Sequence, residues 1–279
     1  MSTERYPQVS VICSVYNGAS HFDKAVPSIL VQTLTDFEFL IVDDGSDDGT
    51  SDFLRQLAER DARVRLFRQE RVGLARAVNH ALSYVRAPYV ARQDFDDISY
   101  PERLAEQVAF LDRNPRVGMV GSWYVLDDAN RGERYVRQMP TDDYSLRRRM
   151  SKAIPFAHTL VTLRTEALRG VGGIAEVNNI TDLRTWIEVA AAGWELANVP
   201  KVLGEHFVYA ESYWHKNFTY RRRQKELARV QVSAIVRLRL GLWRLIYPLG
   251  RLVYGAMPNG LKRFVRRNVV GNTEVDVDR

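Results

Sequence analysis

The chain has 279 residues, of which 46% are hydrophobic and 27% charged, and a single cysteine, Cys13. This composition is typical of a globular protein with a sizeable core, and one cysteine excludes an internal disulfide framework. Because the first residues lack the apolar run of a secretory signal, we expect the protein to act in a reducing compartment, the cytoplasm.

The net charge of +6 is concentrated towards the C-terminal end. Residues 221–267 contain thirteen Lys and Arg against a single acid, Glu226, so this segment carries +12 and the remainder of the chain −6. A basic excess confined to one segment indicates where an anionic partner would bind.

The first 120 residues alternate between apolar runs and helical patterns. Runs rich in β-branched residues predict buried strands at 8–16, 37–42, 64–67, 89–91 and 117–120. Helices are predicted over 22–33, 48–58, 74–85 and from Pro101 to Leu111, the last with Ser99 as its cap. Four strand–helix alternations predict an α/β fold with a mostly parallel, Rossmann-like sheet and helices on both faces.

The pattern changes from Trp123 onwards. Residues 123–138 predict a hairpin, 144–150 a short basic helix, and 154–163 a strand that carries His158. A helix is predicted over 182–192, with Asp182 at its start, and a strand over 199–209.

Polar clusters follow three of the predicted strands: 16–18 (Y-N-G), 43–46 (D-D-G-S) and 94–97 (D-F-D-D). In a parallel sheet the carboxyl ends of the strands share one edge, where ligands bind. Closely spaced carboxylates repel one another unless a cation separates them, so they favour a divalent ion that bridges a diphosphate. The alternative is a solvated acidic turn at the start of a helix. The chain has neither G-x-G-x-x-G after the first strand nor a P-loop, which disfavours those nucleotide sites.

Together these residues resemble family 2 of the glycosyltransferases, with the GT-A fold. The resemblance spans residues 8–210 and rests on the order of six motifs: V-S-V-I-C-S-V-Y-N-G (9–18), S-I-L-V-Q-T (28–33), F-L-I-V-D-D-G-S-D-D-G-T (39–50), G-L-A-R-A-V-N (73–79), A-R-Q-D-F-D-D-I-S-Y-P-E-R-L (91–104) and P-F-A-H-T-L-V-T-L-R (155–164). It implies inverting transfer of a sugar from a nucleoside diphosphate to an acceptor hydroxyl. Residues 1–122 would bind the nucleotide sugar and 123–217 the acceptor.

The resemblance also assigns roles on the donor side. Asp44 would contact the nucleobase with Asp43 beside it, and Asp96 would bind Mn²⁺ or Mg²⁺. Asp94 would contact the ribose or a metal-bound water, or serve as a second metal ligand. The other expected donor contacts are Val15, Tyr16, Asn17 and Arg76.

On the acceptor side, the segment 181–186 (T-D-L-R-T-W) resembles the family's E-D-x-x-L-W element and makes Asp182 the candidate general base. The alternative for Asp182 is a helix cap. His158 and Trp186 would line the acceptor site, and His206 or His215 would approach the metal. Because Thr181 replaces the usual acid, a non-catalytic protein that binds sugar nucleotides is the alternative function.

The tail, residues 218–279, is expected to be a basic amphipathic helical extension. Arg237, Arg244 and Arg251 recur every seven residues and would share a helix face, while Pro248 and Pro258 would interrupt the helix. Such a segment suits an anionic membrane surface, which predicts a peripheral protein on the inner face of the plasma membrane with a glycan or lipid-linked acceptor. The alternative is a helix that packs on the catalytic domain with its arginines solvated. No nucleic-acid partner is expected.

Overall fold

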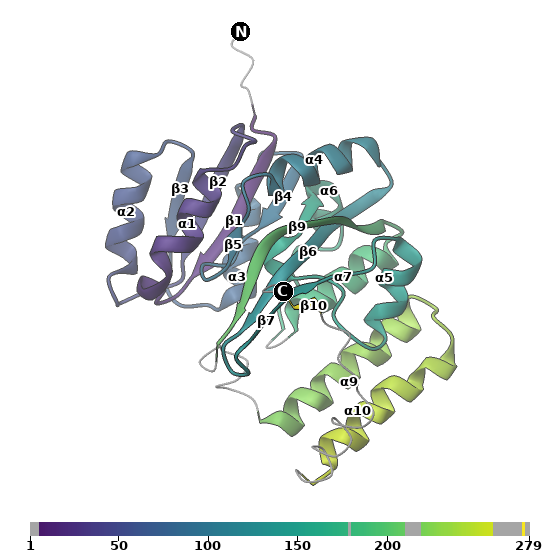
Figure 1. Ribbon diagram of the computed structural model, residues 1–279. Coiled ribbons are helices and arrows are strands. Elements are labelled where there is room, and N and C mark those ends of the chain that lie inside the picture. Colours follow the sequence, from purple (N-terminus) through teal and green to yellow (C-terminus); the bar gives the residue numbers. More distant parts are fainter. Residues whose placement is uncertain (1–5, 178–179, 210–218, 259–274, 277–279) are drawn as a thin grey trace.

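The computed structural model describes residues 6–177, 180–209, 219–258 and 275–276. These residues form one ten-stranded sheet with helices on both faces (Figure 1). The strands run in the order β10-β7-β6-β8-β4-β1-β2-β3, and β9 pairs with β6 and with the short strand β5.

The first half of the sheet is parallel. Its strands are β1 (Val9–Val15), β2 (Phe37–Asp43), β3 (Val64–Arg68) and β4 (Tyr89–Arg92). They are connected through η1 (Ala19–His21), α1 (Phe22–Leu30), α2 (Thr50–Arg60) and α3 (Leu74–Ser83). All seven residues of β2 are buried, as expected for a strand covered on both faces.

The second half of the sheet is mixed. Its strands are β5 (Ile98–Ser99), β6 (Val117–Asp128), β7 (Glu133–Arg137), β8 (Thr162–Arg164), β9 (Glu195–Val208) and β10 (Val275–Asp276). The helical segments between them are α4 (Arg103–Arg113), α5 (Asp143–Met150), η2 (His158–Leu160), α6 (Thr165–Gly170) and α7 (Thr181–Ala191). The predicted α/β fold and the hairpin after Trp123 are confirmed.

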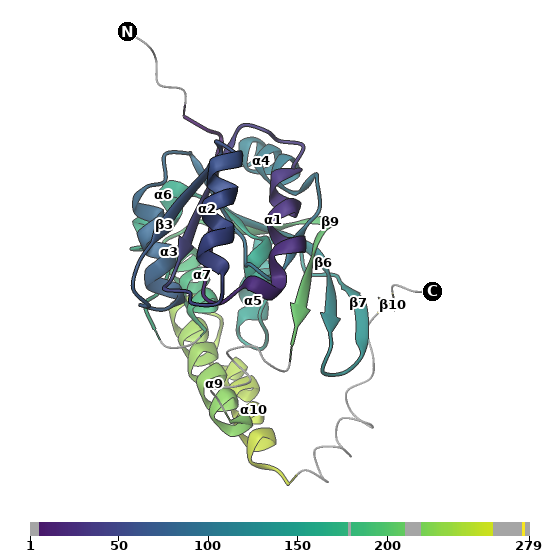
Figure 2. The ribbon, with the colours of Figure 1, turned by 90° about the vertical axis from the view of Figure 1, so that its left-hand side faces the viewer.

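Two hydrophobic clusters fill the space between the sheet and its helices. In the first cluster, the sheet packs against α1, α2 and α4, which contribute residues such as Val26, Leu54 and Leu104. The other is formed with α3, α5, α6 and α7, through residues such as Val78, Leu146, Leu168 and Leu183. The same arrangement of helices is visible from the side in Figure 2.

The tail is helical, and its first helix belongs to the core. It consists of α9 (Tyr220–Arg237), η3 (Leu242–Leu245) and α10 (Ile246–Ala256), which lie below the sheet in Figure 1. Val230 and Ala234 of α9 are completely buried in the cluster that contains Leu183 and Trp186. Within the described residues, no helix is long and apolar enough to cross a membrane.

The arginine pattern of the tail was predicted wrongly. The helix is interrupted at Leu238–Gly241, where Arg239 and Gly241 have φ of 51° and 87°, so Arg237, Arg244 and Arg251 do not share one continuous helix. Pro248 lies in the first turn of α10, where a missing N–H costs no hydrogen bond. Pro258 follows the end of α10.

Two other local predictions are corrected. Residues 154–163 do not form one strand, because η2 occupies His158–Leu160 and strand pairing begins only with β8 at Thr162. In place of the backbone hydrogen bonds of a sheet, side chains bind the backbone there: Gln107 Nε2 donates to Leu160 O, and Thr159 Oγ1 accepts from Asp94 N. Ser99 lies in β5 and does not cap α4, which begins at Arg103 after a turn.

Candidate active site

Backbone hydrogen bonds bring the ends of β1, β2 and β4 together. Asp44 N donates to Val15 O, and Gln93 N donates to Ile12 O, so the segments that follow the three strands are neighbours. This is the carboxyl edge of the parallel sheet, where the sequence placed the donor site.

The two carboxylates at the end of β2, Asp43 and Asp44, are both hydrogen-bonded to neighbouring segments. Asp43 is fully buried and accepts from Ser46 N at 2.9 Å and from the Ser51 hydroxyl. Asp44, 3% exposed, accepts from Gln69 Nε2, Val72 N and Gly73 N at 2.8–2.9 Å. Asp43 therefore shapes its own loop, and Asp44 fixes the segment 69–73.

The segment after β1 is fixed by reciprocal side-chain contacts. Asn17, at φ 53°, donates Nδ2–H to Asp47 Oδ1 and accepts from Asp47 N through Oδ1. Tyr16 is exposed, and the Arg71 guanidinium lies 3.7 Å from the centre of its ring. Sequence reasoning did not single out Arg71, because nothing local connects it to a residue 55 positions earlier.

Two expected donor residues occupy other environments. Val15 is 4% exposed, so its side chain belongs to the core and its backbone carbonyl anchors Asp44. Arg76 is exposed on α3 and pairs with Glu176 at 3.2 Å.

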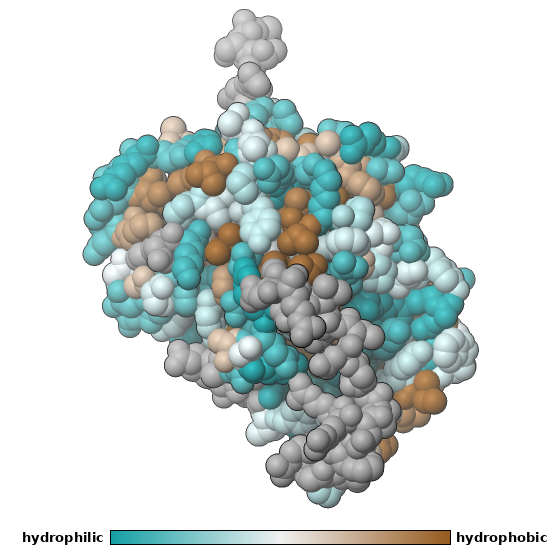
Figure 3. All heavy atoms as spheres, in the orientation of Figure 1, coloured by the Kyte–Doolittle hydropathy of each residue, from teal (hydrophilic) through white to brown (hydrophobic). Residues whose placement is uncertain are grey.

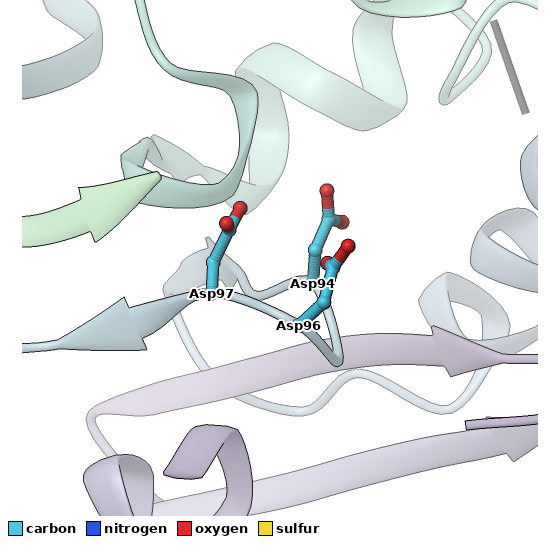
Figure 4. A group of neighbouring side chains, drawn as sticks. All are labelled: Asp94, Asp96 and Asp97. Carbon is cyan, nitrogen blue, oxygen red and sulfur yellow. The ribbon is translucent and has the colours of Figure 1, made fainter. Parts of the chain in front are cut away.

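Asp94, Asp96 and Asp97 form an acidic loop (residues 94–97), and their carboxylates lie within 4.8 Å of one another. Figure 4 shows the three side chains on the same side of the loop. Burial and the neighbouring charges of Asp97 and Asp94 raise the pKa of the Asp96 carboxyl to about 7. Three oxygen donors whose charges oppose one another fit a hard divalent cation.

Two histidines partner the other carboxylates of the acidic loop. His158 Nε2 contacts Asp94 Oδ2, and His206 Nδ1 lies 2.9 Å from Asp97 Oδ2. Burial lowers the pKa of the His158 ring, but Asp94 and Asp182 outweigh it and raise the pKa to about 10. Burial likewise opposes the charge on His206, yet Asp97 raises its pKa.

The same His158 charge acts on Asp94 in return. Burial raises the pKa of the Asp94 carboxyl, but His158 and Arg92 hold it well below its usual value. His158 therefore compensates the charge of one carboxylate of the acidic loop, Asp94, a contact that no sequence motif revealed.

Asp182 lies across from the acidic loop, in the first turn of α7. Its Oδ2 is 3.9 Å from His158 Nδ1, so His158 stands between Asp94 and Asp182. The residue that caps α7 is Ile180, at φ 56°, so Asp182 is not the N-cap. Trp186 is 2% exposed and packs edge-on against Phe156, so any influence of Trp186 on the acceptor side acts through packing. His215 lies outside the described residues.

A buried arginine, Arg103, holds the residues on either side of the acidic loop by hydrogen bonds. Arg103 is fully buried and donates to Arg92 O, Gln93 Oε1 and Ser99 Oγ, which flank the loop on both sides. The same guanidinium reaches Val161 O, and Gln107, one turn later on α4, binds Leu160 O. The donor-side loop and the segment after His158 are thus held by one helix.

Comparisons with known proteins identify the family of the chain. The family model "Glycosyl transferase family 2" matches residues 10–172. A putative glycosyltransferase of Bacillus subtilis, EpsE, is 30% identical over 276 residues, which cover 96% of each protein. The amylovoran biosynthesis glycosyltransferase AmsE of Erwinia amylovora is 28% identical and covers 70% of this chain and 74% of its own length.

Solved structures share the fold. A mannosyltransferase of Pyrobaculum calidifontis, in complex with GDP-Man and Mn²⁺, superposes with a TM-score of 0.64 at 23% identity and covers 96% of this chain and 81% of its own. Residues 1–349 of TarS from S. aureus, with UDP-GlcNAc, give 0.67 at 18% identity and cover 94% and 76%. The family match, the EpsE relative and the GT-A fold together show that this chain belongs to glycosyl transferase family 2 and is a glycosyltransferase.

Proposed function

We propose that the protein transfers a sugar from a nucleoside diphosphate to an acceptor hydroxyl with inversion, and that Asp182 is the general base. The observation that carries this proposal is the position of His158. Its Nε2 contacts Asp94 of the acidic loop, and its Nδ1 lies 3.9 Å from Asp182 Oδ2, so Asp182 is close to the acidic loop. The two fold neighbours hold GDP-Man and UDP-GlcNAc, which supports a nucleotide sugar as the donor.

The donor would lie over the loops after β1 and β2. Three of the roughly four acceptor positions of the Asp44 carboxylate are taken by the segment 69–73, which leaves about one for a base N–H or a ribose hydroxyl. Tyr16 offers a ring for the nucleobase, although a base on the face covered by Arg71 would have to displace that guanidinium. Asn17 and Asp43 would act by fixing these loops.

Asp96, with Asp94 and Asp97 beside it, would hold a divalent cation. Among the three carboxylates, Asp96 is the one without a hydrogen bond from another residue in the described part of the chain, so it is the freest to bind an ion. When bound, the cation would offset negative charge on the departing diphosphate. The Mn²⁺ of the mannosyltransferase neighbour supports this assignment, and the choice between Mn²⁺ and Mg²⁺ stays open to the experiment below.

Asp182 would remove the proton of the acceptor hydroxyl while its oxygen attacks the anomeric carbon. The bond between the anomeric carbon and the diphosphate oxygen breaks in the same displacement, so the configuration inverts without a carboxylate nucleophile. Asp182 is partly exposed, at 24%, which leaves it accessible to an acceptor.

Thermal stability with UDP, GDP, dTDP and CDP, each with and without Mn²⁺ or Mg²⁺, tests the donor side in the wild type and in Asp96→Asn. We expect one nucleotide to raise Tm only with metal and only in the wild type. Equal shifts in both proteins would refute Asp96 as a ligand.

Turnover of the donor identified in this way then tests the base. Asp182→Asn should abolish transfer and leave the nucleotide-dependent Tm shift intact. The control is Asp52→Asn, which changes an exposed carboxylate on α2 and should behave like the wild type. Normal transfer by Asp182→Asn would refute the assignment. No transfer by the wild type, despite nucleotide binding, would favour the non-catalytic alternative.

We further propose that the acceptor is a lipid-linked or cell-surface glycan and that the protein binds an anionic membrane peripherally through 221–267. The amylovoran enzyme supports a role in polysaccharide synthesis, and the +12 charge of this segment supports the membrane. A location on the cytoplasmic side stays a prediction from sequence. Flotation of the full-length protein with anionic but not neutral liposomes would be the expected result.

A further inference from the structure

The junction between the catalytic domain and the tail contains a cavity of about 280 Å³. It lies between α5 and the interruption that follows α9, away from the acidic loop. Among its lining residues are Tyr144, Arg147, Arg148, Arg239, Trp243 and Arg244. Four guanidinium groups and two aromatic rings thus surround a space large enough for a phosphate-sized anion.

The positive charge of this cavity is largely uncompensated. Arg147 is paired with Asp143, but Arg148, Arg239 and Arg244 have no carboxylate partner within the described part of the chain. The side-chain partner of Arg148 is the Tyr144 hydroxyl and not a carboxylate. Guanidinium groups are the preferred partners of phosphate, since their N–H groups match two of its oxygens.

Arg244 is built into the cavity wall. It is 3% exposed, and its Nη1 donates to Ser151 Oγ at 3.0 Å and to Arg148 O at 3.3 Å. Both bonds come from Nη1, so Nε and Nη2 of this cavity-lining guanidinium form no hydrogen bond within the described residues. Arg239 adds a second unusual feature, because its φ of 51° is a backbone conformation that costs energy for a side chain other than glycine.

An apolar stripe on η3 and α10 adjoins the cavity. Its members are large side chains that are more than half exposed: Leu242, Trp243, Ile246, Leu249 and Val253. Figure 3 shows hydrophobic side chains at the outer edge of the molecule, in the region of α10. Trp243 belongs to both features, because it lines the cavity and is 62% exposed.

We propose that this surface docks on a lipid bilayer, with the arginine cavity binding the phosphate of an anionic lipid and the stripe entering the interface. A cationic pocket beside exposed Trp, Leu and Ile is the combination that an anionic bilayer surface binds. Arg237 is hydrogen-bonded to Glu188 and Arg251 to Gln231, and neither lines the cavity, so the membrane face of the tail is the stripe with the cavity and not the row Arg237, Arg244 and Arg251. The inference rests on the proposed function, because it supplies the surface on which a lipid-borne acceptor would be reached.

The test uses the full-length chain, because truncation before α9 would uncover Val230 and Ala234 of the core. Binding is measured by sedimentation with phosphatidylglycerol vesicles and with phosphatidylcholine vesicles at one ionic strength. Arg239→Gln removes a cavity charge, and Lys225→Gln removes an exposed charge of α9 that does not line the cavity. The two variants have the same net charge.

We expect the wild type to bind the anionic vesicles and not the neutral ones. Arg239→Gln should weaken binding about tenfold or more, and Lys225→Gln by about fivefold or less, the effect of one charge near the surface. Trp243→Ala should weaken binding while the thermal stability stays close to that of the wild type. Equal losses in the two glutamine variants would overturn the proposal in favour of diffuse electrostatics.

Two other results would also overturn it. Binding of pyrophosphate in solution that depends on Arg239, without vesicle binding, would make the cavity a site for a soluble anion. A dimer in sedimentation velocity that Trp243→Ala converts to a monomer, again without vesicle binding, would assign the stripe to a second copy. Failure of vesicle binding would leave the Asp96 and Asp182 experiments unaffected, so the two proposals can fail separately.

Discussion

Replacing Arg103 by methionine tests whether one buried cation holds the acidic loop in place. Arg103 is 0% exposed, and its shortest hydrogen bonds are to Arg92 O at 2.6 Å and Ser99 Oγ at 2.7 Å. Methionine keeps most of the apolar volume and removes every donor. The loop would then lose the contacts that fix the residues before and after it.

The size of the effect follows from the acceptors that are left behind. Gln93 Oε1 keeps the Ser99 hydroxyl as a donor, Gln107 Oε1 keeps Thr162, and Val161 O keeps Arg92 N. The loss therefore concentrates on Arg92 O and Ser99 Oγ, at about 1–3 kcal/mol for each unsatisfied buried group. Removal of a buried charge returns part of this cost, so we expect a loss of about 3 kcal/mol in the free energy of unfolding.

Urea denaturation measures this loss, and a fall in Tm of roughly 6–12 °C should accompany it. The matched control is Arg113→Met, on the same helix but exposed, which should change stability by less than about 1 kcal/mol. Arg103→Met should also lose the metal-dependent stabilisation by nucleotide. A variant within 1 kcal/mol of the wild type would refute the idea that this cation organises the loop.

Three further outcomes are expected. The pKa of His158 is raised to about 10 in the folded protein, so its ion pair with Asp94 stabilises the fold fully below about pH 6.5 and less as the pH rises towards 10. His158→Gln should therefore lower the free energy of unfolding by about 2 kcal/mol at pH 6 and by much less at pH 10, measured by urea denaturation without metal. Burial and the like charges of Asp97 and Asp94 raise the pKa of Asp96 to about 7, so Asp96→Asn should stabilise the metal-free protein by about 1–2 kcal/mol at pH 8 and hardly at pH 4. A destabilised variant at pH 8 would contradict these causes. A Cβ on Gly204 would lie 2.4 Å from Ile98 O, so Gly204→Ala should cost about 2 kcal/mol or more by thermal melting, whereas Gly170→Ala, with nothing within 4 Å, should be nearly neutral.

The parallel half of the sheet was predictable because its strands carry their own signal. Apolar, β-branched runs that are buried on both faces, such as β2, are typical of strands in a parallel sheet. The polar clusters at the ends of these strands indicate the edge of the sheet where the candidate site lies. Asp94, Asp96 and Asp182 were singled out as candidates from the same local patterns together with the family motifs, and their roles stay predictions.

The features that were missed depend on partners far away in the chain. The apolar run around His158 looked like a strand, but its backbone is held by Gln107 and Asp94, more than fifty positions earlier. The interruption after α9 rests on Arg239 in a conformation that favours glycine, which no residue preference predicts. The arginine spacing therefore indicated a shared helix face, and the interruption was expected at Pro248 and Pro258, whereas the structure has it at 238–241.

The pairing of β6 with β9 has a consequence for how the chain folds during synthesis. Val117 pairs with Glu195 and Asp128 with Val208, so one whole edge of the twelve-residue β6 stays uncovered until the chain has been made as far as β9. The pairs β1–β2 and β2–β3 are nearer in sequence and can form as they emerge, whereas β4 joins β1 across a separation similar to that between β6 and β9. A long, unpaired edge is a template for association with other chains. In the interval between β6 and β9, newly made chains are therefore prone to aggregate and in need of chaperone protection.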